Sequence, residues 1–234
     1  AYIIPYLKGQ GINNQLWEYR TAAVVAKATN RSLCLEPFHR FYLLNSGREF
    51  IPFEDIYDVF HLDAYVRTES KFVCAEKCKG VVQDMVEIIQ KRGGTFKNAN
   101  VRDPFPIASW RPGSLQKFRR STGFRQVPVP KVINFGEEQS SMGNVRDTFK
   151  SFIEKPCVSI SGTLPQLNSE FLSWSRAMRA SKKVRLAVKK IKKLHLSDGK
   201  YLAVHWRFEE TKCSGIGAGI GYGRAGKGVI KSGK

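Results

Sequence analysis

Residues 2–37, YIIPYLKGQGINNQLWEYRTAAVVAKATNRSLCLEP, decide the fold class of this chain. The run Tyr2–Leu7 is apolar, is rich in β-forming side chains and ends before two glycines, so it predicts a buried strand. From Asn14 to Thr29 apolar side chains recur every three or four residues, which predicts a helix with an asparagine cap. Ser32–Pro37 predicts a second strand. A strand–helix–strand unit of this kind builds a parallel sheet, and the chain is therefore predicted to have an α/β fold.

Composition limits the size of the fold and the class of partner. The chain has 234 residues, of which 42% are hydrophobic, enough for one large domain or for one domain and part of a second. Its 39 basic and 20 acidic residues give a formal charge of +19, which favours anionic partners such as nucleic acid, a membrane surface or a phosphorylated ligand. Apart from a denser run at Lys182–Lys193 the basic residues are dispersed, unlike the clusters typical of nucleic-acid binders. No stretch approaches the roughly 18 to 20 apolar residues that cross a bilayer.

Weaker patterns follow in the middle of the chain. Phe53–Val59 fits either a short helix or a packed loop. Val81–Arg92 carries apolar residues at helical spacing and stops at two glycines, so it predicts a helix. Residues 95–135 are rich in Pro, Arg and Gly and are predicted to form a long connection with brief strands, one of them Lys131–Phe135.

The pattern sharpens again near the C-terminus. Lys182–His195 places its apolar residues on one stripe with lysines elsewhere, which predicts an amphipathic helix with a solvated charged face. Tyr201–Phe208 is apolar enough for a central strand. Residues 214–234 are rich in glycine and poor in core-forming side chains, which predicts a loop.

Cysteine usage favours a disulfide over a metal site. The five cysteines are Cys34, Cys74, Cys78, Cys157 and Cys213. The spacing of Cys74 and Cys78 lacks the two-residue gap and the second Cys or His pair of a zinc site, so we expect a disulfide with one cysteine left over. The sequon Asn30-Arg31-Ser32 would matter only in a secretory lumen. Because Ala1 follows no leader pattern, we interpret the chain as a fragment or a processed form.

Two short segments carry the chemistry of a candidate site, and the first is Gly9–Gln15, GQGINNQ. It follows the first predicted strand, where open α/β sheets bind their ligands. Glycines let the backbone pass close to a ligand, and the amides that begin the next helix attract a negative group, so a phosphate would fit. An ordinary glycine turn with an asparagine cap explains these residues equally well. Asn14 stands where the dinucleotide-binding pattern needs its third glycine, which disfavours nicotinamide cofactors.

The second segment is His205-Trp206-Arg207-Phe208, at the end of a predicted strand. Side chains alternate along a strand, so His205 and Arg207 point to the same face. A buried arginine needs an anion, and its planar guanidinium suits the oxygens of a diphosphate. The alternative is a structural ion pair between Arg207 and Glu209 or another carboxylate. The two segments together predict a site for a phosphate-bearing donor and hence a transferase.

Other signatures fail on inspection. Gly221–Lys227 has the spacing of a phosphate-binding loop, but Gly228 replaces the Ser or Thr that would hold magnesium. The chain contains neither the Gly-x-Ser-x-Gly elbow of serine hydrolases nor the His-Glu-x-x-His pair of zinc hydrolases.

Four segments, in this order, resemble the protein O-fucosyltransferase family. They are Gly11–Gln15 after the first strand, Ala26–Leu33 at the end of the helix, Phe53–Val59, and His205–Glu209. The ends of the chain carry the resemblance, and the residues from about 65 to 180 contribute little.

The resemblance implies a GT-B architecture, in which two Rossmann-like domains face each other across a cleft and the second binds most of the donor, GDP-fucose. The front domain would occupy residues 1–198, and residues 199–234 would begin a truncated donor-binding domain. The implied enzyme is metal-independent, uses no cofactor and passes fucose with inversion to a Ser or Thr hydroxyl of a protein, often a small disulfide-rich module. The implied location is the lumen of the endoplasmic reticulum or Golgi.

The resemblance also assigns roles by position. Arg207 would hold the β-phosphate of the leaving group, His205 would contact the donor, and Glu209 is a further catalytic candidate. The front domain would line the cleft with Gly9, Gly11, Ile12, Asn13 and Asn14, of which the two asparagines are catalytic candidates. No general base is assigned, because Gln10 stands where one branch of the family places a glutamate, and an asparagine cannot take a proton at ordinary pH.

Two other function classes remain as alternatives. One is a non-catalytic module of the same fold that binds a sugar nucleotide or a protein, and the other, ranked lower, is a basic nucleic-acid-binding protein. The strand, aspartate and Ser/Thr-bearing loop that complete the donor pocket in the family should lie beyond Lys234, so we expect this chain alone to bind GDP-fucose weakly.

Overall fold

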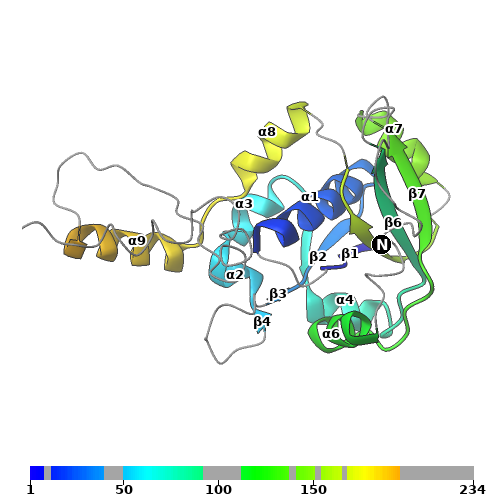
Figure 1. Cartoon of the computed structure of the whole chain (residues 1–234), viewed down its shortest axis with the longest axis horizontal. Coiled ribbons are helices and arrows are strands. Elements are labelled where there is room, and N and C mark those ends of the chain that lie inside the picture. Colours follow the sequence, from blue (N-terminus) through cyan, green and yellow to red (C-terminus); the bar gives the residue numbers. More distant parts are fainter. Residues whose placement is uncertain are drawn as a thin grey trace, which may run out of the picture. The chain divides into compact units, whose positions relative to one another are not determined.

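A computed structural model of the chain describes residues 1–7, 12–39, 50–91, 112–136, 141–150, 154–164 and 168–195 (Figure 1). The chain divides into two compact units, Ala1–Lys189 and Lys190–Lys234. The described part of the second unit is the end of one helix, so the fold below is that of the first unit. None of the helices in the described ranges is both long and apolar enough to cross a membrane.

A six-stranded sheet forms the centre of the first unit, with the strand order β5-β2-β1-β8-β6-β7 and every neighbouring pair parallel. Its strands are β1 (Tyr2–Pro5), β2 (Ser32–Leu35), β5 (Thr68–Ser70), β6 (Asp84–Lys91), β7 (Lys131–Gly136) and β8 (Cys157–Gly162). A short antiparallel pair, β3 (Phe38–His39) with β4 (Phe50–Ile51), follows the end of β2. The predicted α/β fold with a parallel sheet is confirmed.

Helices cover both faces of the sheet (Figure 1). One face carries α1 (Ile12–Ala28), α7 (Met142–Thr148) and α8 (Asn168–Ala177), and the other carries α4 (Lys71–Lys77) and α6 (Pro112–Thr122). Two short helices, α2 (Phe53–Ile56) and α3 (Val59–Asp63), precede β5, and α9 (Lys182–His195) follows α8.

Successive side chains of the strands pack alternately into two separate hydrophobic cores, one on each face of the sheet. Ile3 of β1 and Val158 of β8 point into the core beneath α1, and Ile4 and Cys157 point into the core beneath α4 and α6. A central parallel sheet is covered by helices on both faces, so its strands carry apolar side chains on both faces.

Among the described residues two disulfides lie in this second core, beneath α4 and α6, and tie the middle and the C-terminal cap of α4 to the sheet. Cys34 of β2 bonds Cys74, and Cys78 bonds Cys157 of β8. The predicted disulfide bonding is confirmed: these two bonds use four of the five cysteines, and the fifth, Cys213, lies outside the described residues.

The structure corrects several predictions in the middle of the chain. Val81–Arg92 is not a helix, because Asp84–Lys91 forms strand β6 between β8 and β7. The connection predicted at residues 95–135 contains the helix α6 besides the predicted strand β7. The predicted strand Tyr201–Phe208 and the predicted loop at residues 214–234 lie outside the described residues.

Candidate functional site

The carboxyl edge of the sheet around β1 and β8 is the candidate site. From β1 the chain continues to β2, its neighbour on one side, and from β6 it continues to β7, its neighbour on the opposite side. The strand β8 lies between β1 and β6. Open α/β sheets bind ligands in the crevice where this direction changes. The described part of the sequence motif, from Ile12 to Gln15, begins the helix α1 that follows β1 and therefore starts at this edge.

Three residues of the motif begin α1. Ile12 is half-buried, and Asn13 and Asn14 are exposed at the first turn of the helix. The first backbone N–H groups of a helix carry partial positive charge, so this turn favours a negative group, and the two amide side chains can donate hydrogen bonds beside it. Gly9 and Gly11 lie outside the described residues.

Gln15, the last residue of the same motif, has a structural role. Its side chain is fully buried and forms a pair of hydrogen bonds with the backbone of His39: Nε2 donates to the carbonyl oxygen over 2.8 Å, and Oε1 accepts from the N–H over 2.7 Å. One turn further along α1, the Tyr19 hydroxyl donates to the carbonyl oxygen of Glu36. The start of α1 therefore holds the segment Glu36–His39 against the carboxyl edge of the sheet.

Glu36, which follows β2 at this edge of the sheet, has an unusual environment for a carboxyl group. Its side chain is buried, and neither carboxylate oxygen has a hydrogen-bond partner among the described residues. Burial raises the pKa of Glu36 to about 8, although Lys71 nearby acts in the opposite direction. Glu36 is therefore largely protonated at neutral pH.

His39 is also buried and uncharged. Burial, together with the positive charge of Lys117, lowers its pKa to about 4, and its Nδ1 has no hydrogen-bond partner in the described ranges. No motif in the sequence indicated Glu36 or His39, because their surroundings come from other elements: Tyr19 and Lys71 for Glu36, and Gln15 and Lys117 for His39.

A polar row continues across the sheet on the face covered by α6. Ser161 of β8 is the register partner of Glu87 of β6, and the Tyr6 N–H donates to the carbonyl of Ile160 on the other side. Ser161, Glu87 and Tyr6 are all buried. Burial, and then the carboxylates of Glu18 and Glu87, raises the pKa of Tyr6.

Gly162 ends β8 at this edge with a backbone that only glycine adopts easily. Its φ is +91°, and an added Cβ would lie 2.0 Å from the carbonyl oxygen of Ile88. The close approach of β8 and β6 thus depends on the absence of a side chain.

A hollow of about 270 Å³ lies beside the first half of α1. We call it the Trp17 hollow, and its lining residues are Leu16, Trp17, Arg20, Tyr57, Trp174, Ser175 and Met178. The Arg20 guanidinium lies 4.2 Å from the centre of the Trp17 ring and donates to the carbonyl of Leu164 over 3.1 Å. Sequence patterns did not indicate this hollow, because α1, Tyr57 and the end of α8, which are far apart in the chain, form it together.

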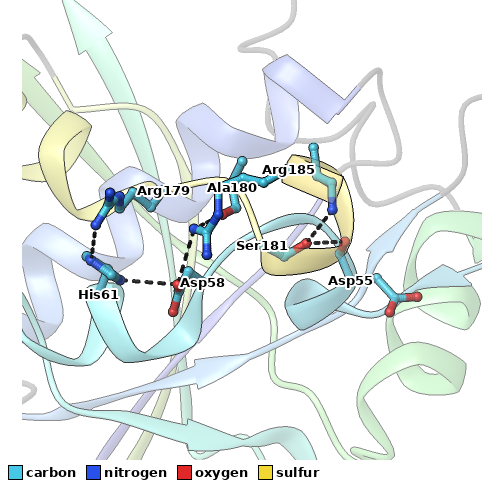
Figure 2. A network of polar contacts seen from close by, with 8 residues as sticks. Asp55, Asp58, His61, Arg179, Ala180, Ser181 and Arg185 are labelled. Atoms are coloured by element: carbon cyan, nitrogen blue, oxygen red, sulfur yellow. Dashed lines mark hydrogen bonds and ion pairs between the residues drawn. The ribbon is translucent and has the colours of Figure 1, made fainter. Parts of the chain in front are cut away.

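A polar network joins Asp55, Asp58 and His61 to residues 179–185 (Figure 2). Tyr57, which lines the Trp17 hollow, lies between Asp55 and Asp58 in the sequence. Tyr57 forms an isolated antiparallel bridge with Ala180, and the Ser181 side chain donates to the carbonyl of Asp55 over 2.8 Å. Asp58 contacts His61 at 3.2 Å and Arg185 at 3.6 Å. The segment between α8 and α9 is therefore held to the junction of α2 and α3.

The remaining predicted site residues, His205, Arg207 and Glu209, lie outside the described residues. Their placement beside Asn13 and Asn14 stays a prediction. Among the residues that the structure describes, no cluster of His, Cys, Asp and Glu is arranged to hold a metal ion.

Comparison with known proteins places the chain in a family. The profile of the GDP-fucose protein O-fucosyltransferases matches residues 2–217, so the chain belongs to this family. No curated protein matches it in sequence.

Solved structures of POFUT1 share the fold. The apo form has a TM-score of 0.56 at 20% identity, covering 92% of this chain and 62% of its own. A complex with GDP-fucose has a TM-score of 0.53 at 20% identity, covering 84% and 56%, and a complex with GDP has 0.55 at 18%, covering 91% and 61%. The chain thus spans about three fifths of these relatives.

Proposed function

We propose that this chain is the front part of an enzyme that transfers fucose from GDP-fucose to a Ser or Thr hydroxyl of a protein. The observation that carries the proposal is the match of the family profile over residues 2–217. The front domain would end at residue 198, and a donor-binding domain would begin at residue 199. Two disulfides in the second core are typical of proteins in an oxidising compartment and support a location in the secretory lumen.

The proposed reaction is an inverting displacement without a metal. The acceptor hydroxyl oxygen attacks the anomeric carbon of fucose, the bond from that carbon to the β-phosphate oxygen breaks, and GDP leaves with the electron pair. Arg207 would stabilise the charge that develops on the β-phosphate, and His205 would contact the donor. Stabilisation of a leaving group by a preorganised cation is one of the largest contributions available to an enzyme.

The described residues would contribute positioning. Asn13 and Asn14 are exposed at the start of α1, where an amide can orient the acceptor hydroxyl. The hydroxyl proton must reach a base, and neither asparagine can accept it. Glu209 is the proposed catalytic carboxylate of the second segment.

The Arg207→Ala variant of a full-length protein tests the proposal. Turnover with GDP-fucose should fall by a factor that corresponds to about 2 to 4 kcal/mol, because one charge partner of the transition state is lost. Arg125→Ala is a matched control, since Arg125 is exposed on the loop after α6 and far in sequence from the motifs. Turnover of the Arg207 variant within a factor of about three of the wild type would make Arg207 a structural residue.

A further inference from the structure

The Trp17 hollow is too small for the donor but suits a single side chain. Sites for drug-sized ligands measure about 300 to 1,000 Å³. The hollow measures about 270 Å³, and a nucleotide sugar is larger than most drugs. Its occupant is therefore a smaller group, of the size of one large amino-acid side chain.

The lining of the hollow resembles the centre of a protein–protein interface. Two tryptophans, a tyrosine and an arginine are four of the seven lining residues, and Trp17 is 39% exposed. Tryptophan, tyrosine and arginine are the residues that most often dominate binding energy at such interfaces. Large rigid rings bury much apolar area and lose little side-chain entropy when a partner binds.

Charge selects an acidic partner. The lining contains Arg20 and no Asp or Glu. Burial lowers the pKa of Arg20 to about 10, which leaves the guanidinium charged at neutral pH. The chain as a whole carries a formal charge of +19, so a partner with carboxylates would be attracted to it and would find a cation inside the hollow.

The position of the hollow links it to the proposed acceptor. Asn13 and Trp17 are four residues apart on α1, so their side chains lie on the same side of the helix, with Cβ atoms about 6 Å apart. Both are exposed. A partner whose side chain fills the hollow would extend over the first turn of α1, where we place the acceptor hydroxyl.

We propose that the Trp17 hollow docks a large apolar side chain of the protein acceptor, with acidic residues of the acceptor flanking it. This inference rests on the proposed function, because it assumes a protein acceptor. It adds a docking contact outside the reacting centre and the chemistry of the acceptor segment that fits there.

A peptide titration tests the hollow without any enzyme activity. The probe is fluorescein-labelled Glu-Asp-Phe-Asp-Glu, compared by anisotropy with Glu-Asp-Gly-Asp-Glu and Gln-Asn-Phe-Asn-Gln. We expect the acidic phenylalanine peptide to bind at least about tenfold more tightly than either comparison peptide, a difference of 1.4 kcal/mol. Equal binding of the two acidic peptides would overturn the proposal, because net charge alone would then explain it.

Two variants locate the binding. Ser175→Trp fills the hollow from an exposed position of α8 and should weaken the phenylalanine peptide at least about tenfold. Phe72→Ala removes an exposed ring from α4, on the opposite face of the sheet, and should leave the affinity within about twofold. Unchanged affinity in Ser175→Trp would overturn the proposal.

Kinetics of the full-length protein separate this inference from the proposed function. Trp17→Ala should raise the KM for an unfucosylated protein acceptor at least about tenfold, with the rate of GDP-fucose hydrolysis in the absence of acceptor unchanged. If Trp17→Ala still transfers fucose with an unchanged KM for the acceptor, or if it changes the oligomeric state, the docking role is overturned and the proposed function is not. If the wild-type full-length protein showed no turnover of GDP-fucose, that result would instead contradict the proposed function.

Discussion

At the scale of single residues, Glu36 makes the stability of the fold depend on pH. Its pKa rises from 4.5 to about 8 on folding, so between these values the folded chain binds more protons than the unfolded chain. The free energy of unfolding therefore falls as pH rises, by up to about 1.4 kcal/mol per pH unit. Glu36→Gln should remove this dependence between pH 6.5 and 8, as measured by urea unfolding.

The pH range of this test begins at 6.5 because the pKa of His39 shifts in the opposite direction to that of Glu36. The pKa of His39 falls from 6.5 to about 4, so the folded chain binds fewer protons between these values, and stability is lost as pH drops through them. The two effects offset each other below pH 6.5. Glu76→Gln, an exposed change on α4, is the control, and it should keep the wild-type slope. A Glu36→Gln variant with that same slope would contradict the prediction.

The candidate site could be predicted from sequence only where a residue belongs to a motif. The motif correctly predicted a helix after the first strand, but α1 begins at Ile12, so Asn13 and Asn14 are exposed residues of its first turn and neither is the predicted cap. It gave no hint that Gln15 binds the backbone of His39, since a buried and an exposed glutamine look alike in a sequence. The environments of Glu36 and His39 come from residues of other elements, Lys71 of α4 for Glu36 and Lys117 of α6 for His39, which local patterns do not reveal.

At the scale of elements, Gly162 is the position where the sheet tolerates no side chain. In Gly162→Ala the new Cβ would lie 2.0 Å from the Ile88 carbonyl oxygen, at a φ of +91°. We expect a loss of about 3 kcal/mol or more in the free energy of unfolding, because strained backbone and a steric clash add. Urea unfolding measures the loss.

Gly143→Ala is the matched control for that substitution. Gly143 lies in the first turn of α7, and the nearest atom to its added Cβ is the Ser141 hydroxyl oxygen at 3.8 Å. The change should be neutral or stabilising by up to about 1 kcal/mol, since alanine favours helices over glycine. Similar stabilities for the two variants would show that the β8–β6 approach can relax.

Elements were predictable where their period or their turn residues are visible in the sequence, as for the apolar strand β1 that ends before two glycines. α1 and α9 show helical spacing clearly, and both were found close to their observed limits. β6 was mistaken for a helix because Met85, Val86 and Ile88 enter two different cores, which removes the two-residue period of a half-buried strand. The central strand β8, Cys157–Gly162, gave no prediction for the same reason and because half of it is serine and glycine.

At the scale of the whole molecule, the proposed division into a front domain and a donor-binding domain predicts how this chain alone interacts with GDP-fucose. The chain spans about three fifths of the POFUT1 structures that share its fold. The described anion-attracting feature of the candidate edge is the start of α1, and a helix terminus contributes only about 0.3 to 2 kcal/mol to the binding of a negative group. Micromolar affinity needs about 8 kcal/mol. The donor contacts that supply the difference are therefore expected from Arg207 and from residues further along the chain.

Calorimetric titration of the 234-residue chain with GDP-fucose should accordingly show no saturable binding in the micromolar range, whereas a full-length protein should bind. Thermal unfolding of the same sample, monitored by circular dichroism, should be cooperative and unchanged by the donor, because only ligand bound to the folded state raises the melting temperature. Together these results would describe a folded front domain with an incomplete donor site. Micromolar binding to the 234-residue chain would place the donor site in the front domain and contradict the assignment of the donor to the second.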